Sequence, residues 1–408
     1  MSLGQSTVTT ITNILKTRYP QKKLYEMNYA DCALLGIIKK DPKFGGNNTR
    51  ITVNYGRSQG SALFATALAN TTADDDAAFV VTRAKDYHVI TMSAEAIEAS
   101  DGDGNSLMKA FDKAHKNGIL SFKRSTSQQL YRNGGGARGK VSAGSAVATN
   151  TISLATPSDS VFFEVNMFLQ ASTADGTSGG VKAGQEMISA INRTLGTIRS
   201  TSAAWNTVIT TLAVNDFLFR AGDFGACIKG LDAWVPAADP TGGDNFFGVD
   251  RSVDAVRLAG IRYVATAGAA KEDTLLDAAV LLALEGGKPT HVLCNPRDRA
   301  DIIKNLGSHA VYDKTMSTEG IVGYQALMLQ ADRGPLEVLG DPNCPRGIFY
   351  ILQLDTWTLG SLKAVPHVVD DDGKMMSRQA ASDGIEWRLR AFAQMYCEAP
   401  GYNCRGTF

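Results

Sequence analysis

The longest helical pattern in the chain lies before a run of three glycines, Gly134–Gly136. Apolar or small residues recur at the spacing that places them on one face of an α-helix; they are Leu107, Phe111, Ala114, Gly118 and Phe122. Asn105 or Ser106 is suited to cap the helix start by accepting a backbone N–H. The glycines provide a stop, because glycine adopts the left-handed conformation without penalty. We expect a helix of roughly 25–30 residues, about 40 Å long.

Strand patterns precede this helix. Residues 50–55 (RITVNY) alternate apolar and polar positions, and residues 78–92 are also rich in strand-forming side chains. Small and polar residues fill the segment between them. We therefore expect a long projecting hairpin, which needs a neighbour to lie on because isolated two-stranded hairpins are marginally stable in water. Residues 1–50 carry short helical stripes at 8–15 and 24–40, which indicate an arm lying on a neighbour.

Short strand patterns follow the helix. The segment 151–222 contains strand-like runs separated by Gly, Ser and Asp turns, at 151–154, 160–170, 187–198 (a hairpin turning at 193–196), 205–213 and 216–220. Short strands at such spacing predict a small β-barrel or β-rich insertion.

After a loop-rich stretch at 230–262, the sequence has the pattern of an α/β domain. Helices are predicted at 274–284, with Asp273 as the cap and Gly286–Gly287 as the stop, and at 296–306, with Asn295 as the cap and proline at the first position. The predicted strands are 290–294, 326–330, 336–339, 349–354, 357–362, 364–369 and an alternating closing strand at 383–398.

Charge and hydropathy narrow the classes of protein. The 408 residues hold 41 Lys+Arg and 41 Asp+Glu, a formal net charge of 0. This balance argues against a strongly basic nucleic-acid-binding domain and against a self-repelling monomer. No apolar run reaches the ~18 residues of a membrane span, and the N-terminus lacks the apolar core of a signal peptide. We expect a soluble protein made in the cytoplasm, with no membrane partner.

The six cysteines are dispersed and contain no CxxC pair. We interpret them as reduced, small apolar residues of a cytosolic protein. Cys397 and Cys404 are close enough in sequence to approach each other, although free thiols are the favoured interpretation.

Two motifs at the ends of the long helix resemble ligand sites. Residues 134–141 (GGGARGKV) nearly match a phosphate-binding loop, but Val141 replaces the Ser/Thr that holds Mg²⁺, and the loop follows a helix instead of a strand. Residues 101–112 resemble a calcium loop, but Ser106 replaces the required Gly and Asp112 the bidentate Glu. A glycine turn and an acidic helix cap explain them better.

From the remaining candidate residues and motifs we expect that the protein has no cofactor and no metal site and is not an enzyme. Asp370–Asp372 precede Gly373 and fit an Asp-Gly turn, and Asp74–Asp76 fit solvated hairpin positions. The five histidines lack metal-ligand spacing. Cys294 lies in an apolar strand, where thiols are usually inert, and no G-x-S-x-G elbow is present.

The order of the elements resembles the major capsid protein of tailed double-stranded DNA bacteriophages, the Hong Kong 97-type fold. The resemblance is carried by NDFLFRAGDF (215–224), IKGLDAWVP (228–236), DNFFGVDRSVDAVRLAG (244–260), THVLCNPRDRADI (290–302) and IEWRLRAFAQMYCEAPGYN (385–403). It implies an α+β fold with an N-terminal arm (1–50), an extended hairpin loop (51–92), a peripheral domain with a spine helix (93–150 and 383–408), a β-barrel-like insertion (151–222) and an α/β axial domain (223–382).

The implied function is that of a structural protein of the virion, assembled in the host cytoplasm. It would form pentamers and hexamers of an icosahedral shell that contacts packaged double-stranded DNA non-specifically. The expected partners are a separate scaffolding protein, since no charged heptad run is present, a portal protein and possible decoration proteins. Inter-subunit contacts are expected at Arg57, Leu63, Phe64, Leu68 and Arg83.

Some members of this family cross-link a loop lysine to a neighbour's asparagine. Residues 56–76 contain no lysine, so we expect no such cross-link here. Two other functions remain open at this point: the shell of an encapsulin-like nanocompartment, and a P-loop nucleotide-binding enzyme built on Gly134–Lys140.

Overall fold

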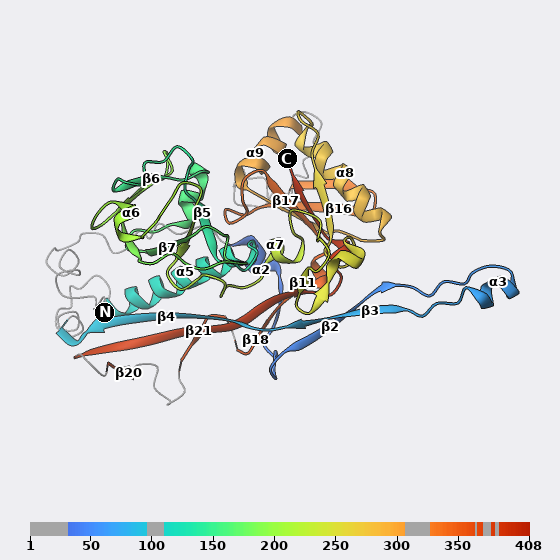
Figure 1. Ribbon diagram of the computed structural model, residues 1–408, viewed down its shortest axis with the longest axis horizontal. Helices are drawn as coiled ribbons and strands as arrows, with labels where there is room; N and C mark the ends of the chain where they lie inside the picture. Colours follow the sequence, from blue (N-terminus) through green and yellow to red (C-terminus); the bar gives the residue numbers. More distant parts are fainter. Residues whose placement is uncertain (1–31, 96–109, 307–326, 364, 370–376, 380–382) are drawn as a thin grey trace, which may run out of the picture.

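The computed structural model describes residues 32–95, 110–306, 327–363, 365–369, 377–379 and 383–408. Figure 1 shows a long, narrow sheet, a helix along it, two rounded modules on the same side of that sheet, and a hairpin that projects far beyond the body. Residues 101–109 of the calcium-loop motif, the helix caps at 105–106 and the Asp370–Asp372 turn lie outside the described residues.

The long sheet is built around β21 (Gly384–Cys397). This strand pairs antiparallel with β4 (Ala84–Ser93) on one side, and with β18 (Trp357–Ser361), β19 (His367–Val368) and β20 (Ser377–Arg378) on the other. The short strand β1 (Lys39–Asp41) adds to β18 in parallel. The closing strand predicted at 383–398 is therefore confirmed.

The helix α5 (Ala110–Leu130) lies on one face of this sheet. Phe122 and Ile119 pack against an apolar cluster from both long strands, made of Ile90, Met92, Trp387, Leu389 and Ala391. A β-carbon on Gly118 would approach Ile90 Cδ1 to 2.2 Å, so the glycine allows the helix to lie close to β4.

The predicted helix stop is wrong by several residues. The helix ends at Leu130, and Gly134 and Gly136, with φ of +87° and +89°, instead turn the chain into β5. The reason is tertiary: Gly230 packs so closely on the helix end that its added β-carbon would lie 2.2 Å from the Leu130 carbonyl oxygen. Gly230 N–H then donates to the carbonyl of Arg132 at 2.8 Å.

The projecting hairpin consists of β2 (Thr49–Gly56) and β3 (Asp75–Val81), joined through a short helix, α3 (Phe64–Ala69). The strand-rich stretch predicted at 78–92 is divided at Thr82–Arg83, so that β3 belongs to the hairpin and β4 to the long sheet. The prediction of two strands with a long excursion between them is otherwise confirmed.

The first rounded module is a six-stranded sheet in the order β5-β10-β7-β8-β9-β6. Its strands are β5 (Ala137–Lys140), β6 (Thr151–Ser153), β7 (Phe168–Ser172), β8 (Glu186–Asn192), β9 (Thr197–Ser200) and β10 (Phe217–Arg220). An antiparallel bridge between Val141 and Leu154 joins the two edge strands, so the sheet closes around an apolar core.

Of the strands predicted in this module, the one at 205–213 is wrong, and the one at 160–170 is confirmed only at 168–170, within β7. Residues Pro157–Phe162 form a 3-10 helix, because Pro157 at its start and Asp159 in its first turn favour a helical turn over a strand. Trp205–Val208 form a short helix, α6. There the indole of Trp205 is buried and donates to the carbonyl of Asn150 at 3.0 Å, so packing decides the local conformation.

The second rounded module is a six-stranded sheet in the order β13-β22-β17-β14-β16-β15. Its strands are β13 (Ile261–Val264), β14 (His291–Cys294), β15 (Leu327–Ala331), β16 (Gly334–Gly340), β17 (Ile348–Leu352) and β22 (Cys404–Thr407). It carries the helices α8 (Lys271–Leu284) and α9 (Pro296–Leu306). We refer to it as the C-terminal module.

Most elements of the C-terminal module agree with the sequence patterns. Asn295 caps α9 as predicted, its side chain accepting from Arg297 N–H at 3.1 Å. Asp273 is not the cap of α8, because the helix begins at Lys271. Strand β22 was not predicted, yet it lies inside the sheet, between the edge strand β13 and β17.

Shorter elements connect these parts. They are α2 (Ala33–Ile37), α7 (Leu231–Trp234), the ribbon of β11 (Asn245–Phe246) and β12 (Val249–Asp250), and 3-10 turns at Arg251–Asp254, Leu354–Thr356 and Pro400–Tyr402. Asp341 joins α2 and the end of α5 to the C-terminal module, accepting from Leu34 N–H at 3.2 Å and from the Tyr131 hydroxyl at 2.9 Å.

Candidate assembly surfaces

The tip of the hairpin presents apolar side chains to solvent. Leu63, Phe64 and Leu68 are 86%, 83% and 69% exposed. They stand on α3, whose turns are held by backbone bonds such as Ala67 N–H to the Leu63 carbonyl at 2.8 Å. Scattered exposed apolar residues are ordinary, but a cluster of large ones on a projecting element is typical of an interaction site. All three were predicted as contact residues, and the structure brings them together.

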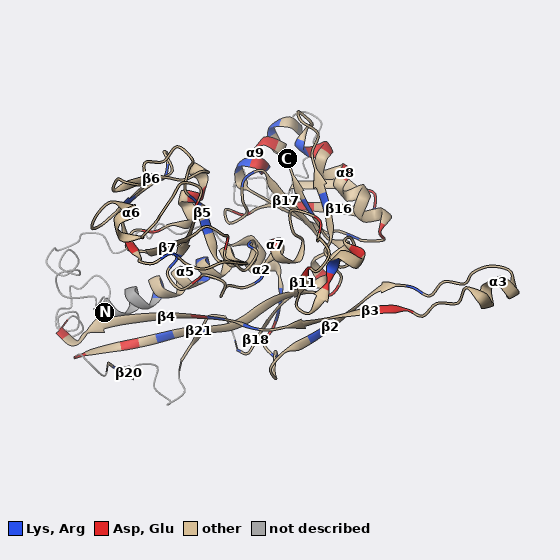
Figure 2. Ribbon diagram, viewed as in Figure 1, with Lys and Arg blue, Asp and Glu red and all other residues tan. Residues whose placement is uncertain are grey.

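The hairpin arms below the tip carry the charges. Residues 58–73 contain no ionisable side chain, and Figure 2 shows α3 and the adjoining loops without charge. Asp74, Asp75 and Asp76 are exposed, as predicted. The Asp74 carboxylate accepts from Ser58 N–H at 2.6 Å, and Asp76 accepts from the Asn54 amide at 3.0 Å. Arg57 is exposed on the opposite arm.

Arg83, the other predicted contact, lies at the base of the hairpin. Its guanidinium donates to the carbonyl of Phe44 at 2.8 Å and to that of Gly46 at 2.6 Å, and lies 5.2 Å from the centre of the Phe44 ring. These bonds connect the turn that follows β3 to the loop that precedes β2. Arg83 thus has partners within its own chain.

An aromatic cluster holds the hairpin base. Phe79 on β3 packs edge-on against Trp234 and Phe246, with ring centroids 5.2 Å and 6.2 Å away. Val80 N–H donates to the Phe247 carbonyl at 2.8 Å, and Arg257 donates to the Tyr55 carbonyl at 2.6 Å. Sequence reasoning treated the segment around Trp234 as loop, although its density of aromatic residues was a signal of a packed core.

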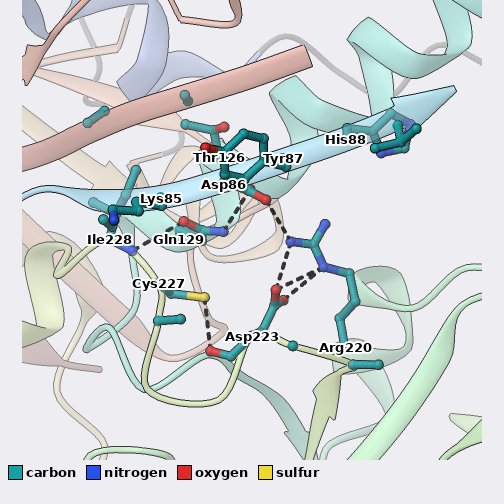
Figure 3. A pocket seen from close by; sticks show the side chains of 17 residues that line it. Lys85, Asp86, Tyr87, His88, Thr126, Gln129, Arg220, Asp223, Cys227 and Ile228 are labelled. Carbon is teal, nitrogen blue, oxygen red and sulfur yellow. Dashed lines mark hydrogen bonds and ion pairs between the residues drawn. The ribbon is translucent and has the colours of Figure 1, made fainter. Parts of the chain in front are cut away.

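A cavity of about 410 Å³ lies where β4, α5 and the loop after β10 meet. Figure 3 shows Asp86, Gln129, Arg220 and Asp223 around it. Arg220 forms ion pairs with Asp223 at 2.7 Å and with Asp86 at 3.3 Å. Arg138, fully buried behind them, bonds to Asp223 at 3.0 Å. These ion pairs thereby join the first rounded module, which contains β10, to β4 of the long sheet.

Burial and the neighbouring charges act in opposite directions on the pKa values of the two arginines in this network. Burial alone would lower the pKa of Arg220, but the carboxylates of Asp223 and Asp86 outweigh it and the pKa is raised. For Arg138 burial dominates and lowers the pKa, with Asp223 opposing. The pKa of His88, at the cavity wall, is lowered by burial and then by the positive charge of Arg220, against the effect of Asp86.

Parts of the other candidate chemical groups also lie in the described residues. Residues 137–140 of the phosphate-loop motif form strand β5 and not the helix that a nucleotide site requires. Among the described residues, no group of three His, Cys, Asp or Glu side chains is placed to hold a metal ion. None of the six cysteines, all of which lie in the described residues, forms a disulfide. Burial raises the pKa of Cys294, Cys397 and Cys404 to about 12.

None of the helices in the described part of the chain is long and apolar enough to cross a membrane.

Comparison with solved structures identifies the fold. The chain aligns with the capsid subunit of cyanophage A-1(L) at a TM-score of 0.56 and 14% identity, over 96% of each chain. It aligns with the capsid protein of a native GTA particle at a TM-score of 0.51 and 9% identity, over 99% of each. The SrpI encapsulin of Synechococcus elongatus aligns at 0.47 and 7%, too low a similarity to carry an argument.

The fold is therefore that of phage capsid proteins, as the sequence resemblance implied: a mixed α+β chain that is rich in strands and aligns with nearly the whole length of these capsid chains. No protein-family model and no curated protein sequence matches the chain. The chain therefore resembles these capsid proteins in its three-dimensional arrangement, whereas its amino-acid sequence has diverged from theirs.

Proposed function

We propose that this chain is a major capsid protein that assembles into the pentamers and hexamers of an icosahedral phage head enclosing double-stranded DNA. The observation that carries the proposal is the whole-chain likeness to a phage capsid subunit. It is supported by a projecting hairpin whose apolar tip is left uncovered by the described parts of the chain. A structural role in the virion follows, in place of catalysis.

The parts of the chain take the family's roles in this proposal. Residues 1–50 act as the N-terminal arm, 51–92 as the extended loop, 151–222 as an inserted β-domain, and α5 as the spine of the peripheral domain. Strand pairing favours one revision of the boundaries. Strands β18, β19 and β20 pair with β21 and would belong with the peripheral domain, whereas β22 (404–407) would complete the sheet of the axial domain.

Assembly would be driven by burial of the hairpin tip on a neighbouring subunit. Full burial of one large apolar side chain contributes about 1.5–3 kcal/mol. Leu63, Phe64 and Leu68 would supply this at every contact around a capsomer, which makes them the anchors. The exposed Arg57 would pair with a neighbour's carboxylate. Net neutrality keeps the repulsion between subunits low.

The other partners follow from the same role. A separate scaffolding protein would direct assembly in the host cytoplasm, a portal protein would replace one pentamer, and decoration proteins are possible outer partners. The inner surface would contact packaged DNA through its phosphates, without sequence preference.

Expression of the chain followed by negative-stain microscopy tests the proposal. Rings or closed shells are expected from the intact chain, and stable unassembled subunits from a variant lacking residues 56–76. Shells that form equally well without the hairpin would refute its role, and an intact chain that stays monomeric with its scaffolding protein would refute the function. Nucleic acid as the natural content separates a phage head from an enzyme-filled nanocompartment.

A further inference from the structure

Helix α8 presents an apolar row of side chains to solvent. Leu284 is 77% exposed and Val280 is 49% exposed, and the half-buried Leu276 precedes them on the same helix. Their spacing places the three side chains along one face. The opposite side of α8 is apolar as well, with Leu282 buried in the core of the C-terminal module. Helices that are apolar all round are normally buried all round, so we expect a partner to cover this row.

Two acidic side chains lie at the start of this row. Asp273 and Asp277 are exposed on successive turns of α8, and Figure 2 shows acidic positions along the helix. Lys271, the basic residue of α8, is engaged by two carboxylates of α9, at 2.7 Å and 2.9 Å. At the far end Glu285 lies 3.9 Å from Arg257, so the excess of negative charge is at the start. We call the two aspartates and the apolar row the α8 flank, whose partner needs apolar surface and positive charge.

The α9 side of the same module carries exposed positive charge. Arg297 on α9 and Arg346 before β17 are exposed, and neither forms an ion pair with another described residue. Gly347 N–H donates to the Asp298 carboxylate at 2.8 Å, which holds the turn that carries Arg346 beside the first turn of α9. The exposed ring of Pro296 adds apolar surface. We call Pro296, Arg297 and Arg346 the α9 flank, and its chemistry is the one that the α8 flank requires.

The two flanks lie towards opposite sides of the C-terminal module, as the positions of α8 and α9 in Figure 1 show. A surface and its complement on opposite sides of one chain pair head to tail between copies, and such contacts can close into rings. We propose that the α8 flank of one copy packs on the α9 flank of the next, where its aspartates face the two arginines. This inference rests on the proposed function and deepens it, because it names a contact between subunits that does not involve the hairpin.

Charge reversal on the full-length chain tests the contact. The variants Asp273→Arg/Asp277→Arg and Arg297→Asp/Arg346→Asp each place like charges across it. We expect the association constant between copies, measured by sedimentation velocity, to fall about tenfold in each, because exposed ion pairs are replaced by repulsion. A variant with all four changes restores opposite charges and should associate like the parent protein. Arg199→Asp, an exposed position on β9, is the control and should leave the association constant unchanged.

A mixture of the two double variants gives a second readout. Each variant alone meets itself with like charges, whereas alternating copies of the two variants meet with opposite charges at every contact. The equimolar mixture should therefore recover rings with an even number of subunits, seen by negative-stain microscopy. A mixture or a fourfold variant that associates as weakly as the separate double variants would overturn the inference.

The outcomes separate this contact from the proposed function. Shells that form equally well from the parent protein and from both double variants would overturn the inference and leave the function standing. Oligomers that weaken on charge reversal but never close into shells would support the contact and contradict the function, and a parent chain that stays monomeric would contradict both. If circular dichroism shows that a double variant is unfolded, Val280→Ser/Leu284→Ser replaces it: the same fall is expected, and an unchanged association constant would overturn the inference.

Discussion

The ring of Phe79 meets the indole of Trp234 edge-on, at 61° and with 5.2 Å between the centroids. Phe79 lies on hairpin strand β3, and Trp234 lies on α7, more than 150 residues later in the chain. Both side chains are fully buried. The direction in which the hairpin projects is thus set at its base by packing against the segment that leads into the C-terminal module.

Replacing Phe79 with alanine should loosen the hairpin base. The buried ring contacts two aromatic neighbours, and its removal is expected to lower the free energy of unfolding by about 3–5 kcal/mol. Chemical denaturation measures this loss. Phe79→Leu serves as the control and should lose clearly less, since it retains most of the apolar volume. A loss below about 1 kcal/mol for alanine would contradict the anchoring role.

Polar substitution of the hairpin tip should separate assembly from folding. The triple variant Leu63→Ser/Phe64→Ser/Leu68→Ser is expected to abolish rings and shells in negative-stain images, because the apolar anchors are lost. Its free energy of unfolding should change by less than about 0.5 kcal/mol per site, as these side chains are exposed in the subunit. Thr66→Ser on the same helix is the control and should assemble normally. A triple variant that assembles as well as the parent protein would exclude the tip as the anchor.

Gly230→Ala should destabilise the junction at the end of α5. The new β-carbon would lie 2.2 Å from the Leu130 carbonyl oxygen, a backbone atom that cannot rotate away. Overpacking of this kind costs typically 1–3 kcal/mol, which thermal or chemical unfolding detects. The control is Gly144→Ala, where no atom lies within 4 Å of the added carbon. Equal stability of the two variants would show that the close approach is not required.

Acidification should weaken the fold through His88. Burial, followed by the charge of Arg220, lowers the pKa of His88 below its usual value near 6.5, while Asp86 acts in the opposite direction. The unfolded chain therefore binds the proton more readily, so this contribution to stability is complete above about pH 6.5 and decreases as the pH falls towards the lowered pKa. The variant His88→Gln should show a smaller loss of stability between pH 7 and 5. An identical pH profile for parent and variant would refute this assignment.

Thiol labelling should distinguish Cys32 from the other cysteines. Cys32 is half-buried, whereas the other five are buried. The pKa of Cys397 and Cys404 is raised to about 12 by burial, which leaves little of the reactive thiolate at neutral pH. Native protein treated with a maleimide should label at Cys32 first, and all six sites should label after denaturation. Rapid native labelling of Cys397 would contradict its buried position.

The periodicity of apolar residues in the sequence was sufficient to predict the long elements of secondary structure. The alternation at 383–398 predicted β21 closely, and the pattern at 296–306 predicted α9 with its Asn295 cap. The candidate site was partly predicted in the same way, because large apolar residues in an otherwise small and polar excursion indicated Leu63, Phe64 and Leu68. These features are local, so the residues that determine them lie next to one another in the chain.

Features that depend on distant residues escaped prediction. The end of α5 is set by Gly230, about a hundred residues away, and not by the adjacent glycines. Strand β22 has only four residues and gains its stability from two flanking strands. The expected contact of Arg83 with another subunit stays a prediction, whereas its two bonds to the carbonyls of Phe44 and Gly46 in the same chain were not foreseen from the sequence.

The pairing of β4 with β21 has a consequence for the order of folding. Residues 84–93 find their partners at 384–393, near the other end of the chain, and closing so large a loop carries a high entropic cost. Proteins dominated by such non-local contacts fold slowly. The hairpin, whose strands are close in sequence, can form long before the sheet that supports α5. Each newly made chain would therefore display its apolar tip while its central sheet is still incomplete, and its yield should depend on chaperones and on low temperature during synthesis.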